Sequence, residues 1–462
     1  MKRALLFMAM FAAAGAGCGH THDEEGRAGD GVTILEEEPV GEASSAVVVS
    51  ALHAVRVGRE IFFDTNLSSP AGQSCAGCHA LNRAFTDPIN SPTSQGVVAG
   101  RFGHRNAPTL GYAAFNPPLH SEIEDNGDLG FEGGFFWDGR ANSLAAQAKE
   151  PFLNPLEMNN PDKAAVVAKV RASIYAPIFR AAFGDTSLDD VDTAFDNIAV
   201  ALERFEQTRL FFPLTSKYDA FLAGKATLSP AEARGHALFI DPARTPCAEC
   251  HTPTNGAGGG FFTKFGFYNH GLPKNPNNPF YSNLTVNPAG SAFDDRGFGA
   301  VIADPAFDGA FKAPTLRNVA RTGPYMHNGV FSTLKEVVHF YNTRDVASPP
   351  FPAPEFPGSI NTPQIGNLGL TSAEEDDIVA FLGTLNDATP TIDGTCTAAG
   401  TFSARNREFP GHAVGLCGVD EFFPEEAAAA CGGKPLKYFG YSCANNTYLG
   451  THTWTAYFSC CQ

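Results

Sequence analysis

The sequence of 462 residues has few basic residues and, after its first 17, no long apolar run. Lysine and arginine number 32 against 49 acidic residues, which gives a net charge of −17. This deficit disfavours nucleic acid and anionic membrane surfaces as partners, and it favours basic proteins or neutral small molecules. The absence of a later apolar run excludes a membrane helix in the body of the chain. A hydrophobic content of 43% still provides for a sizeable core in two or three domains.

Strand patterns are also scarce before the last 70 residues, so the bulk of the chain is predicted to be mainly α. The 47 glycines and 33 prolines are scattered without a period. This excludes a collagen-like or low-complexity chain and predicts long loops between the helices.

The eleven cysteines fall into three groups: Cys18 alone, two C-x-x-C pairs, and six within the last 67 residues. Residues 1–18 have a basic start, a short apolar run and small residues directly before Cys18, which predicts a signal peptide. The end of this segment resembles the lipobox of bacterial lipoproteins, in which the cysteine is acylated. Ordinary signal cleavage nearby is the alternative. We therefore expect the periplasm or the outer cell surface, with a lipid anchor at Cys18, and an acidic tether over residues 19–50.

The body of the chain contains an internal repeat. Residues 58–62 (GREIF) lead into a CAGCH string at residues 75–79, and residues 235–239 (GHALF) lead into a CAECH string at residues 247–251. A duplicated small helical domain explains both copies, and we expect the two domains over residues 51–222 and 223–388. Helical spacing of apolar residues predicts a closing helix for each domain, over residues 190–212 and 371–385.

C-x-x-C-H is the attachment signature of c-type haem. Cys75 and Cys78 can each form a thioether to one porphyrin, and His79 then presents its imidazole to the iron. The second copy offers the same set in Cys247, Cys250 and His251. A zinc site is less favoured because it needs four ligands close together, and the two pairs lie 172 residues apart. A disulfide in each pair would leave the two histidines unexplained. We expect two cytochrome-c-like haem domains in tandem.

Residues 389–462 carry the other six cysteines, which predict a small disulfide-rich module in an exported protein. Fifteen pairings are open, and the role of the module is open too. These cysteines are Cys396, Cys417, Cys431, Cys443, Cys460 and Cys461.

From residue 52 to about 387 the chain resembles the bacterial di-haem cytochrome c peroxidases and their MauG-like relatives. The matching strings are RNAPT at 105–109, FWDGR at 136–140, NPLEM at 154–158, PTLRNV at 314–319 and PYMHNG at 324–329. The resemblance implies that His79 is the proximal ligand of the haem where peroxide reacts, and that His251 is the ligand of a haem that relays electrons. Trp137 matches the tryptophan between the haems, which implies a relay for electrons or holes.

The resemblance also implies a distal pocket of three residues. Gln147, Pro151 and Glu157 lie ten, fourteen and twenty residues after Trp137, as the family places them. A carboxylate over the iron can take a proton from bound peroxide and return it to the leaving oxygen. Burial should raise the pKa of Glu157 and ease this exchange. Gln147 would orient the peroxide, and Pro151 would deny the sixth position to a protein ligand.

The other axial ligand of the second haem separates peroxidases, which use methionine, from MauG-like members, which use tyrosine. Tyr341 occupies the family position, fourteen residues after His327, and Met326 is the rival. Thr333 and Glu336 predict a capping box that starts the helix carrying Tyr341. We expect Tyr341 to be the ligand.

Further residues match family positions. Asn106, Thr322 and Pro324 match those that hold calcium between the haem domains, and Arg140 and Arg317 suit either haem propionates or the surface. Residues 116–135 form an extra loop that is expected to cover or reshape access to the peroxidatic haem. No histidine matches the one that caps this haem in resting peroxidases.

The resemblance therefore implies an exported enzyme that reduces hydrogen peroxide with electrons from a small redox protein, a cytochrome c or a copper protein. A MauG-like oxidase acting on a partner protein and a non-catalytic electron carrier are the alternatives. The sequence gives no oligomeric state.

Overall fold

The computed structural model describes seven stretches of the chain: residues 41–123, 129–253, 260–360, 364–388, 396–405, 436–446 and 451–461. Side chains are described from residue 50 to residue 388 within these stretches. The predicted signal peptide, Cys18 and most of the predicted tether lie outside the described residues. The described part of the tether differs from the prediction, because residues 41–50 belong to a helix that continues to Phe63.

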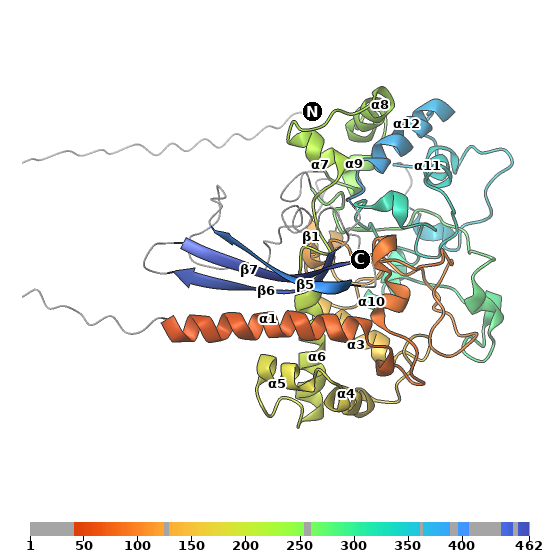
Figure 1. The fold of residues 1–462 in the computed structure, drawn as a ribbon. Helices are drawn as coiled ribbons and strands as arrows, with labels where there is room; N and C mark the ends of the chain where they lie inside the picture. Colours follow the sequence, from red (N-terminus) through yellow and green to blue (C-terminus); the bar gives the residue numbers. More distant parts are fainter. Residues whose placement is uncertain are drawn as a thin grey trace, which may run out of the picture. The chain divides into compact units, whose positions relative to one another are not determined.

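The described body of the chain is mainly helical, as predicted (Figure 1). The helices are α1 (Gly41–Phe63), α2 (Cys75–Cys78), α3 (Leu144–Leu153), α4 (Lys163–Ala172), α5 (Ala176–Phe183), α6 (Val191–Glu206), α7 (Lys217–Leu222), α8 (Pro230–Ile240), α9 (Cys247–Cys250), α10 (Phe298–Ile302), α11 (Leu334–Thr343) and α12 (Ser372–Gly383). Within the described ranges, every helix is too short or too polar to cross a membrane.

Two short antiparallel sheets interrupt the helices, and the sequence patterns missed both. One pairs β1 (His120–Ile123) with β2 (Leu129–Glu132), and the other pairs β3 (Phe267–Tyr268) with β4 (Phe311–Lys312). Near the C-terminus, β5 (Cys396–Arg405), β6 (Leu436–Asn446) and β7 (Thr451–Cys461) form a sheet in the order β5-β7-β6. The cysteine side chains of this region lie outside the described side chains, so the disulfide module stays a prediction.

The first core is built from the apolar faces of α1 and α3 to α6. Its fully buried residues include Phe62, Phe152, Phe179 and Ile198. The face predicted for the closing helix is the face that α6 buries, but α6 ends at Glu206 instead of residue 212. The Thr208 hydroxyl bonds back to the Phe205 carbonyl, and a turn after it carries Phe211 into the core.

The second core repeats this plan with α8, α11 and α12. Phe239, Phe262, Ile378 and Phe381 are its buried centre, and Tyr218 of α7 joins it. The predicted closing helix at 371–385 is confirmed as α12, with a capping box at Thr371 and Glu374. Each of these helices is stable because its apolar face is buried, while its cap satisfies the free backbone donors of the first turn.

A matching pair of glycines lies at an equivalent close helix crossing in each of the two cores. A Cβ on Gly58 of α1 would lie 1.9 Å from the Ala201 carbonyl oxygen of α6. A Cβ on Gly235 of α8 would lie 1.8 Å from the Asp377 carbonyl oxygen of α12. Only glycine permits so close a helix crossing. The glycine that opens each sequence repeat is therefore the point where the first helix of each core crosses the last.

Candidate active site

The two CxxCH strings fold in the same way. α2 and α9 are single turns, in which the His79 amide donates to the Cys75 carbonyl and the His251 amide to the Cys247 carbonyl, both at 2.9 Å. The two cysteines of each string are three positions apart in this turn, so their thiols share one face of it. All four thiols are free. Disulfides within the pairs are therefore not present in the structure.

Each histidine of these strings is held in one tautomer. Nδ1 of His79 donates to the Phe85 carbonyl at 2.9 Å, and Nδ1 of His251 donates to the Phe262 carbonyl at 3.0 Å. A carbonyl oxygen can only accept, so Nε2 of each ring keeps its lone pair. Burial lowers the pKa of His79, and it lowers that of His251 to about 4. Both imidazoles are therefore neutral and suited to bind iron.

A cavity lies between the first CxxCH string and α3. The predicted residues that line it are Cys75, Cys78, His79, Asn106, Trp137, Gln147, Pro151 and Glu157. Gln147 and Pro151 are four residues apart on α3, which puts them on one face of that helix. Ser143 caps the start of α3, and its hydroxyl accepts from the Ala146 amide at 3.0 Å. The structure thus brings the predicted haem attachment residues and the predicted distal residues to one cavity.

Glu157 stands in the turn after α3. Its backbone amide donates to the Asn154 carbonyl, and Asn154 Nδ2 donates to its Oε1 at 3.0 Å. Burial raises the pKa of Glu157 to about 7, with Arg140 lowering it and Glu150 raising it. A carboxyl group with this pKa can both take and return a proton near neutral pH.

Trp137 is fixed between the two halves of the chain. Its indole Nε1 donates to the Asn106 carbonyl at 2.9 Å, and its own carbonyl accepts from the Lys312 amide at 2.8 Å. Lys312 and Pro314, which belong to the second predicted domain, line the same cavity. Burial lowers the pKa of Lys312 to about 7. The cavity is therefore completed by residues that follow the second CxxCH string.

The two rival ligands for the second haem lie side by side. The Tyr341 hydroxyl is 3.8 Å from the Met326 sulfur, and the His270 ring is 5.3 Å from the Tyr341 ring. The capping box of Thr333 and Glu336 that starts the helix carrying Tyr341 is confirmed. Burial and then the nearby Cys250 and Cys247 raise the pKa of Tyr341. The tyrosine is therefore beside the second attachment site.

Two arginines of the matching strings, Arg140 and Arg317, form ion pairs, and the pair of Arg317 is buried. Arg317 is 1% exposed and pairs with Asp219, with Nη1 and Nη2 at 2.7 and 2.9 Å from its carboxylate oxygens. A surface role for Arg317 is therefore wrong, because its guanidinium is buried and paired with Asp219. Arg140 pairs with Asp138 and Glu150, both at 2.9 Å.

The predicted calcium residues and the extra loop are placed as follows. The Asn106 amide donates to the His327 carbonyl at 2.7 Å, which joins it to the string that contains Pro324. The Thr322 hydroxyl donates to the Val319 carbonyl at 3.1 Å. The described parts of the extra loop form the β1–β2 hairpin, whose Glu132 pairs with Gly266 next to β3. Asn116 and Phe135, at its two ends, line the cavity.

Sequence reasoning did not single out Tyr112, Glu206 and Lys312, which line the cavity wall. The sequence did contain a pattern that could have identified Glu206, because this residue falls four positions after Leu202 on the apolar face of α6. Its Oε2 makes no hydrogen bond within the described residues, and burial raises its pKa to about 8. Tyr112 and Lys312 gave no signal, because their positions depend on contacts distant in sequence.

The site fits two c-type haems on its own chemistry. It offers paired free thiols and neutral histidines with an available Nε2, and the first pair opens on a cavity with apolar and ionisable walls. Among the described residues, the group of side chains close enough to share a metal ion is His120, Glu122 and Glu132, and none of these belongs to a CxxCH string. A zinc site at the cysteine pairs is therefore not supported.

The comparisons with known proteins agree with this chemistry. The family model described as di-haem cytochrome c peroxidase matches residues 53–227. The methylamine utilization protein MauG of Paracoccus denitrificans is 41% identical over 351 residues, covering 72% of this chain and 88% of that protein. The chain belongs to the di-haem cytochrome c peroxidase family.

Other members are similar over comparable lengths. The cytochrome c551 peroxidase of Pseudomonas aeruginosa is 30% identical, covering 80% of this chain and 86% of that protein. The crystal structure of the diheme peroxidase BthA from Burkholderia thailandensis matches with a TM-score of 0.65 and 33% identity, covering 73% of this chain and 86% of that chain. As a di-haem cytochrome c peroxidase, the protein is an oxidoreductase that acts on peroxide, and its cofactors are two c-type haems.

Proposed function

We propose that the protein reduces hydrogen peroxide in the cavity of His79, with electrons delivered through the His251 site by a small redox protein. The observation that carries this proposal is the Glu157 carboxyl group, which has a pKa of about 7 and shares one cavity with Gln147, Pro151 and His79. The haem bound there would supply the redox-active iron.

The residues of the cavity would act as follows. Cys75 and Cys78 would hold the cofactor, and His79 Nε2 would bind its iron. Glu157 would take a proton from peroxide and return it to the leaving oxygen, so that water departs. The Gln147 amide would orient the peroxide, and Pro151 would deny the iron a second protein ligand. Two electrons and two protons convert one peroxide to two waters.

The test of this proposal is steady-state turnover of peroxide by the haem-loaded protein with a reduced cytochrome c or copper protein. The acidic surface, with a net charge of −17, suits a basic donor, so the rate should fall as salt is added. Absence of turnover with every such donor would reject the peroxidase function. A purely electron-carrying protein would also lose nothing when Glu157 is replaced.

A second function is favoured by Tyr341. Phenolate ligation stabilises ferric and higher oxidation states, whereas thioether ligation raises the potential. With Tyr341 bound, the enzyme would store two oxidising equivalents and oxidise a partner protein, as a MauG-like oxidase. Axial-ligand spectroscopy of both ferric haems discriminates the two functions. Tyrosinate on the second haem and a long-lived doubly oxidised state after one equivalent of peroxide would favour the oxidase, and methionine would favour the peroxidase.

The proposal also includes a location and a third cofactor. Export to the periplasm or the outer surface with a lipid on Cys18 is supported by the N-terminal sequence alone.

Calcium is supported by the oxygen donors of Asn106, Thr322 and Pro324, because the Asn106 Nδ2 donates to the Pro92 carbonyl and leaves its Oδ1 for a cation.

A further inference from the structure

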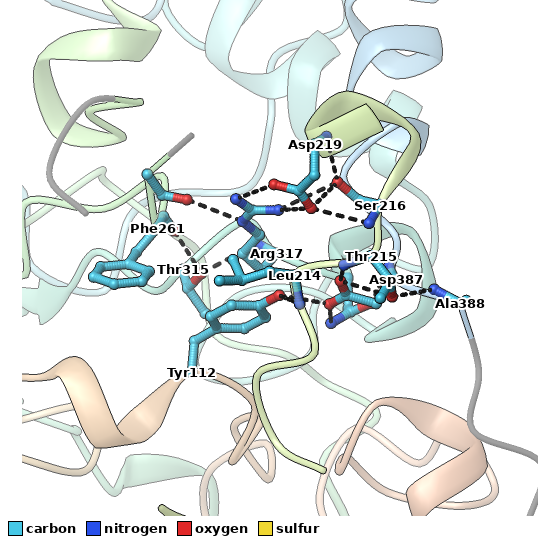
Figure 2. Close-up of polar contacts among 12 residues, drawn as sticks. Tyr112, Leu214, Thr215, Ser216, Asp219, Phe261, Thr315, Arg317, Asp387 and Ala388 are labelled. Atoms are coloured by element: carbon cyan, nitrogen blue, oxygen red, sulfur yellow. Dashed lines mark hydrogen bonds and ion pairs between the residues drawn. The ribbon is translucent and has the colours of Figure 1, made fainter. Parts of the chain in front are cut away.

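Tyr112 is a buried phenol in the wall of the His79 cavity. It is 2% exposed, and its hydroxyl donates to Asp387 Oδ2 at 2.8 Å (Figure 2). The two residues are 275 positions apart, and the bond joins the first predicted domain to the end of the second. Tyr112 also holds a left-handed backbone with φ of 62°, which is strained for an aromatic residue. This tyrosine is therefore fixed in place at some cost in free energy.

The carboxylate of Asp387 is held in one orientation by hydrogen bonds. It receives the Thr215 amide and the Asn318 side-chain amide at 2.8 Å each, which fix its orientation toward Tyr112. The Leu214 amide donates to the Tyr112 oxygen at 3.2 Å, so the phenol oxygen is held from a second side (Figure 2). The phenolic hydrogen is thus directed at the carboxylate along one short hydrogen bond.

The Arg317 guanidinium lies 5.4 Å from the centre of the Tyr112 ring. A fixed positive charge at this distance disfavours a second positive charge on the ring. A phenol that loses an electron becomes a strong acid and must release its proton to a nearby base. Arg317 and Asp387 together therefore favour simultaneous loss of the electron and the proton.

Trp137, the other oxidisable side chain of the same wall, lacks this arrangement. Its indole N–H donates to the Asn106 carbonyl, which is not a base that can keep the proton. Oxidation of Trp137 therefore leaves a cation, and oxidation of Tyr112 leaves a neutral radical. The neutral Tyr112 radical is therefore the more stable form in which to hold an oxidising equivalent beside Arg317.

We propose that Tyr112 is a second redox relay of the cavity, which is oxidised by proton-coupled electron transfer to Asp387. Tyr112 gives one electron to the cofactor that peroxide has oxidised, and its O–H bond breaks while an O–H bond forms on Asp387. One electron from the external donor or partner protein then restores the phenol, and the proton returns from Asp387. This inference rests on the proposed function, because peroxide is the oxidant.

The position of Tyr112 suits a relay between the two haem sites. Its ring centre is 6.1 Å from that of Phe261, and the next residue, Phe262, supplies the carbonyl that fixes His251. The Phe261 carbonyl is itself held by the Thr315 hydroxyl at 2.6 Å (Figure 2). An oxidising equivalent on Tyr112 is therefore close to the loop that supports the second haem ligand.

The experiment uses the haem-loaded, diferric protein, mixed with one equivalent of hydrogen peroxide, frozen rapidly and examined by electron paramagnetic resonance. Protein made with ring-deuterated tyrosine identifies a tyrosyl radical by the narrowing of its signal and needs no substitution. Y112F should abolish this signal, and D387N should reduce it. The matched control is Y175F, because the Tyr175 hydroxyl donates to Asp64 at 2.7 Å in a buried position that does not line the cavity. Y175F should leave the signal unchanged.

The outcomes separate this inference from the proposed function. If peroxide changes the haem absorption spectrum but no tyrosyl signal forms, or the signal survives in Y112F, the relay is wrong and the peroxidase function stands. If peroxide leaves the haem spectrum unchanged, the proposed function fails and the relay fails with it. Optical spectra of each variant before peroxide show whether the haems are bound as in the wild type.

Discussion

The Glu157 carboxyl group is the side chain on which the proposed reaction depends most directly. E157Q keeps the shape and the hydrogen bond from Asn154 but cannot take a proton. General acid–base catalysis of this kind contributes about 10²–10⁴-fold, so kcat/KM for peroxide should fall by that factor. E150Q, on the far side of Arg140, is the matched control and should retain most of the activity. An equal loss in both variants would contradict the role of Glu157.

The same carboxyl group predicts the pH dependence of the reaction. Glu157 must be ionised to accept the first proton, so kcat/KM should rise with pH through about 7 and then level off. Glu150 raises this pKa and Arg140 lowers it. E150Q should therefore move the midpoint to lower pH, and R140Q should move it to higher pH. A midpoint that stays fixed in both variants would assign the titration to another group.

Glu206 predicts a pH dependence of stability. Burial raises its pKa from 4.5 to about 8 in the folded protein, so folding favours the protonated form. Stability is full below pH 4.5 and falls as the pH rises toward 8, by a few kcal/mol at most. E206Q should remove this loss, which melting temperatures at pH 5 and pH 8.5 would measure against E60Q, a surface control. An identical pH dependence in E206Q and the wild type would refute the assignment.

Among single residues, the sequence predicted best those whose role depends on near neighbours. His79 and His251 could be assigned because their partner cysteines are one and four positions away in CxxCH. Tyr112 could not, because its partner Asp387 and its neighbour Arg317 are brought to it only by the fold. The family pattern also gave Glu157, and burial raises its pKa in the structure as expected, but the opposing effects of Arg140 and Glu150 on this pKa needed the structure.

The helix crossings at Gly58 and Gly235 are the elements on which each haem domain depends. In G58A and G235A the new methyl group would lie within 2 Å of a carbonyl oxygen, so the helices must move apart. We expect each substitution to cost at least about 2 kcal/mol of unfolding free energy. G383A is the matched control, because no atom lies within 4 Å of its added Cβ, and it should gain up to about 1 kcal/mol. Denaturant titration of the haem-loaded variants measures the predicted loss and the predicted gain of unfolding free energy.

Elements were predicted well where apolar spacing and caps agree. α12 matches its predicted range because a capping box starts it and its buried face has helical spacing. α6 was predicted six residues too long, because Phe211 and Phe212 continue its apolar pattern although they belong to a turn. The two small sheets were missed because strands of two to four residues are too short to show alternation.

The two halves of the chain are joined by buried polar contacts that no local pattern could reveal. The Tyr112 hydroxyl of the first half donates to Asp387 of the second half, and Arg317 pairs with Asp219 (Figure 2). Asp219 lies on α7, whose Tyr218 packs in the second core. The repeat in the sequence predicted two similar domains, but it held no information about how they would be joined. Buried ion pairs of this kind stabilise one arrangement of partners because a broken pair leaves an isolated charge inside the protein.

The buried Arg317–Asp219 pair allows a prediction about the unfolding free energy of the protein. R317M leaves the Asp219 carboxylate without its charged partner in the interior and should cost about 3–5 kcal/mol of unfolding free energy. D219N keeps a side chain that can cap α7 but removes the unpaired charge, so R317M/D219N should recover part of the loss. K163M, which breaks the exposed pair with Asp192, should leave stability unchanged. If the double variant is no more stable than R317M, the lost packing of the arginine, and not the isolated charge, determines the cost.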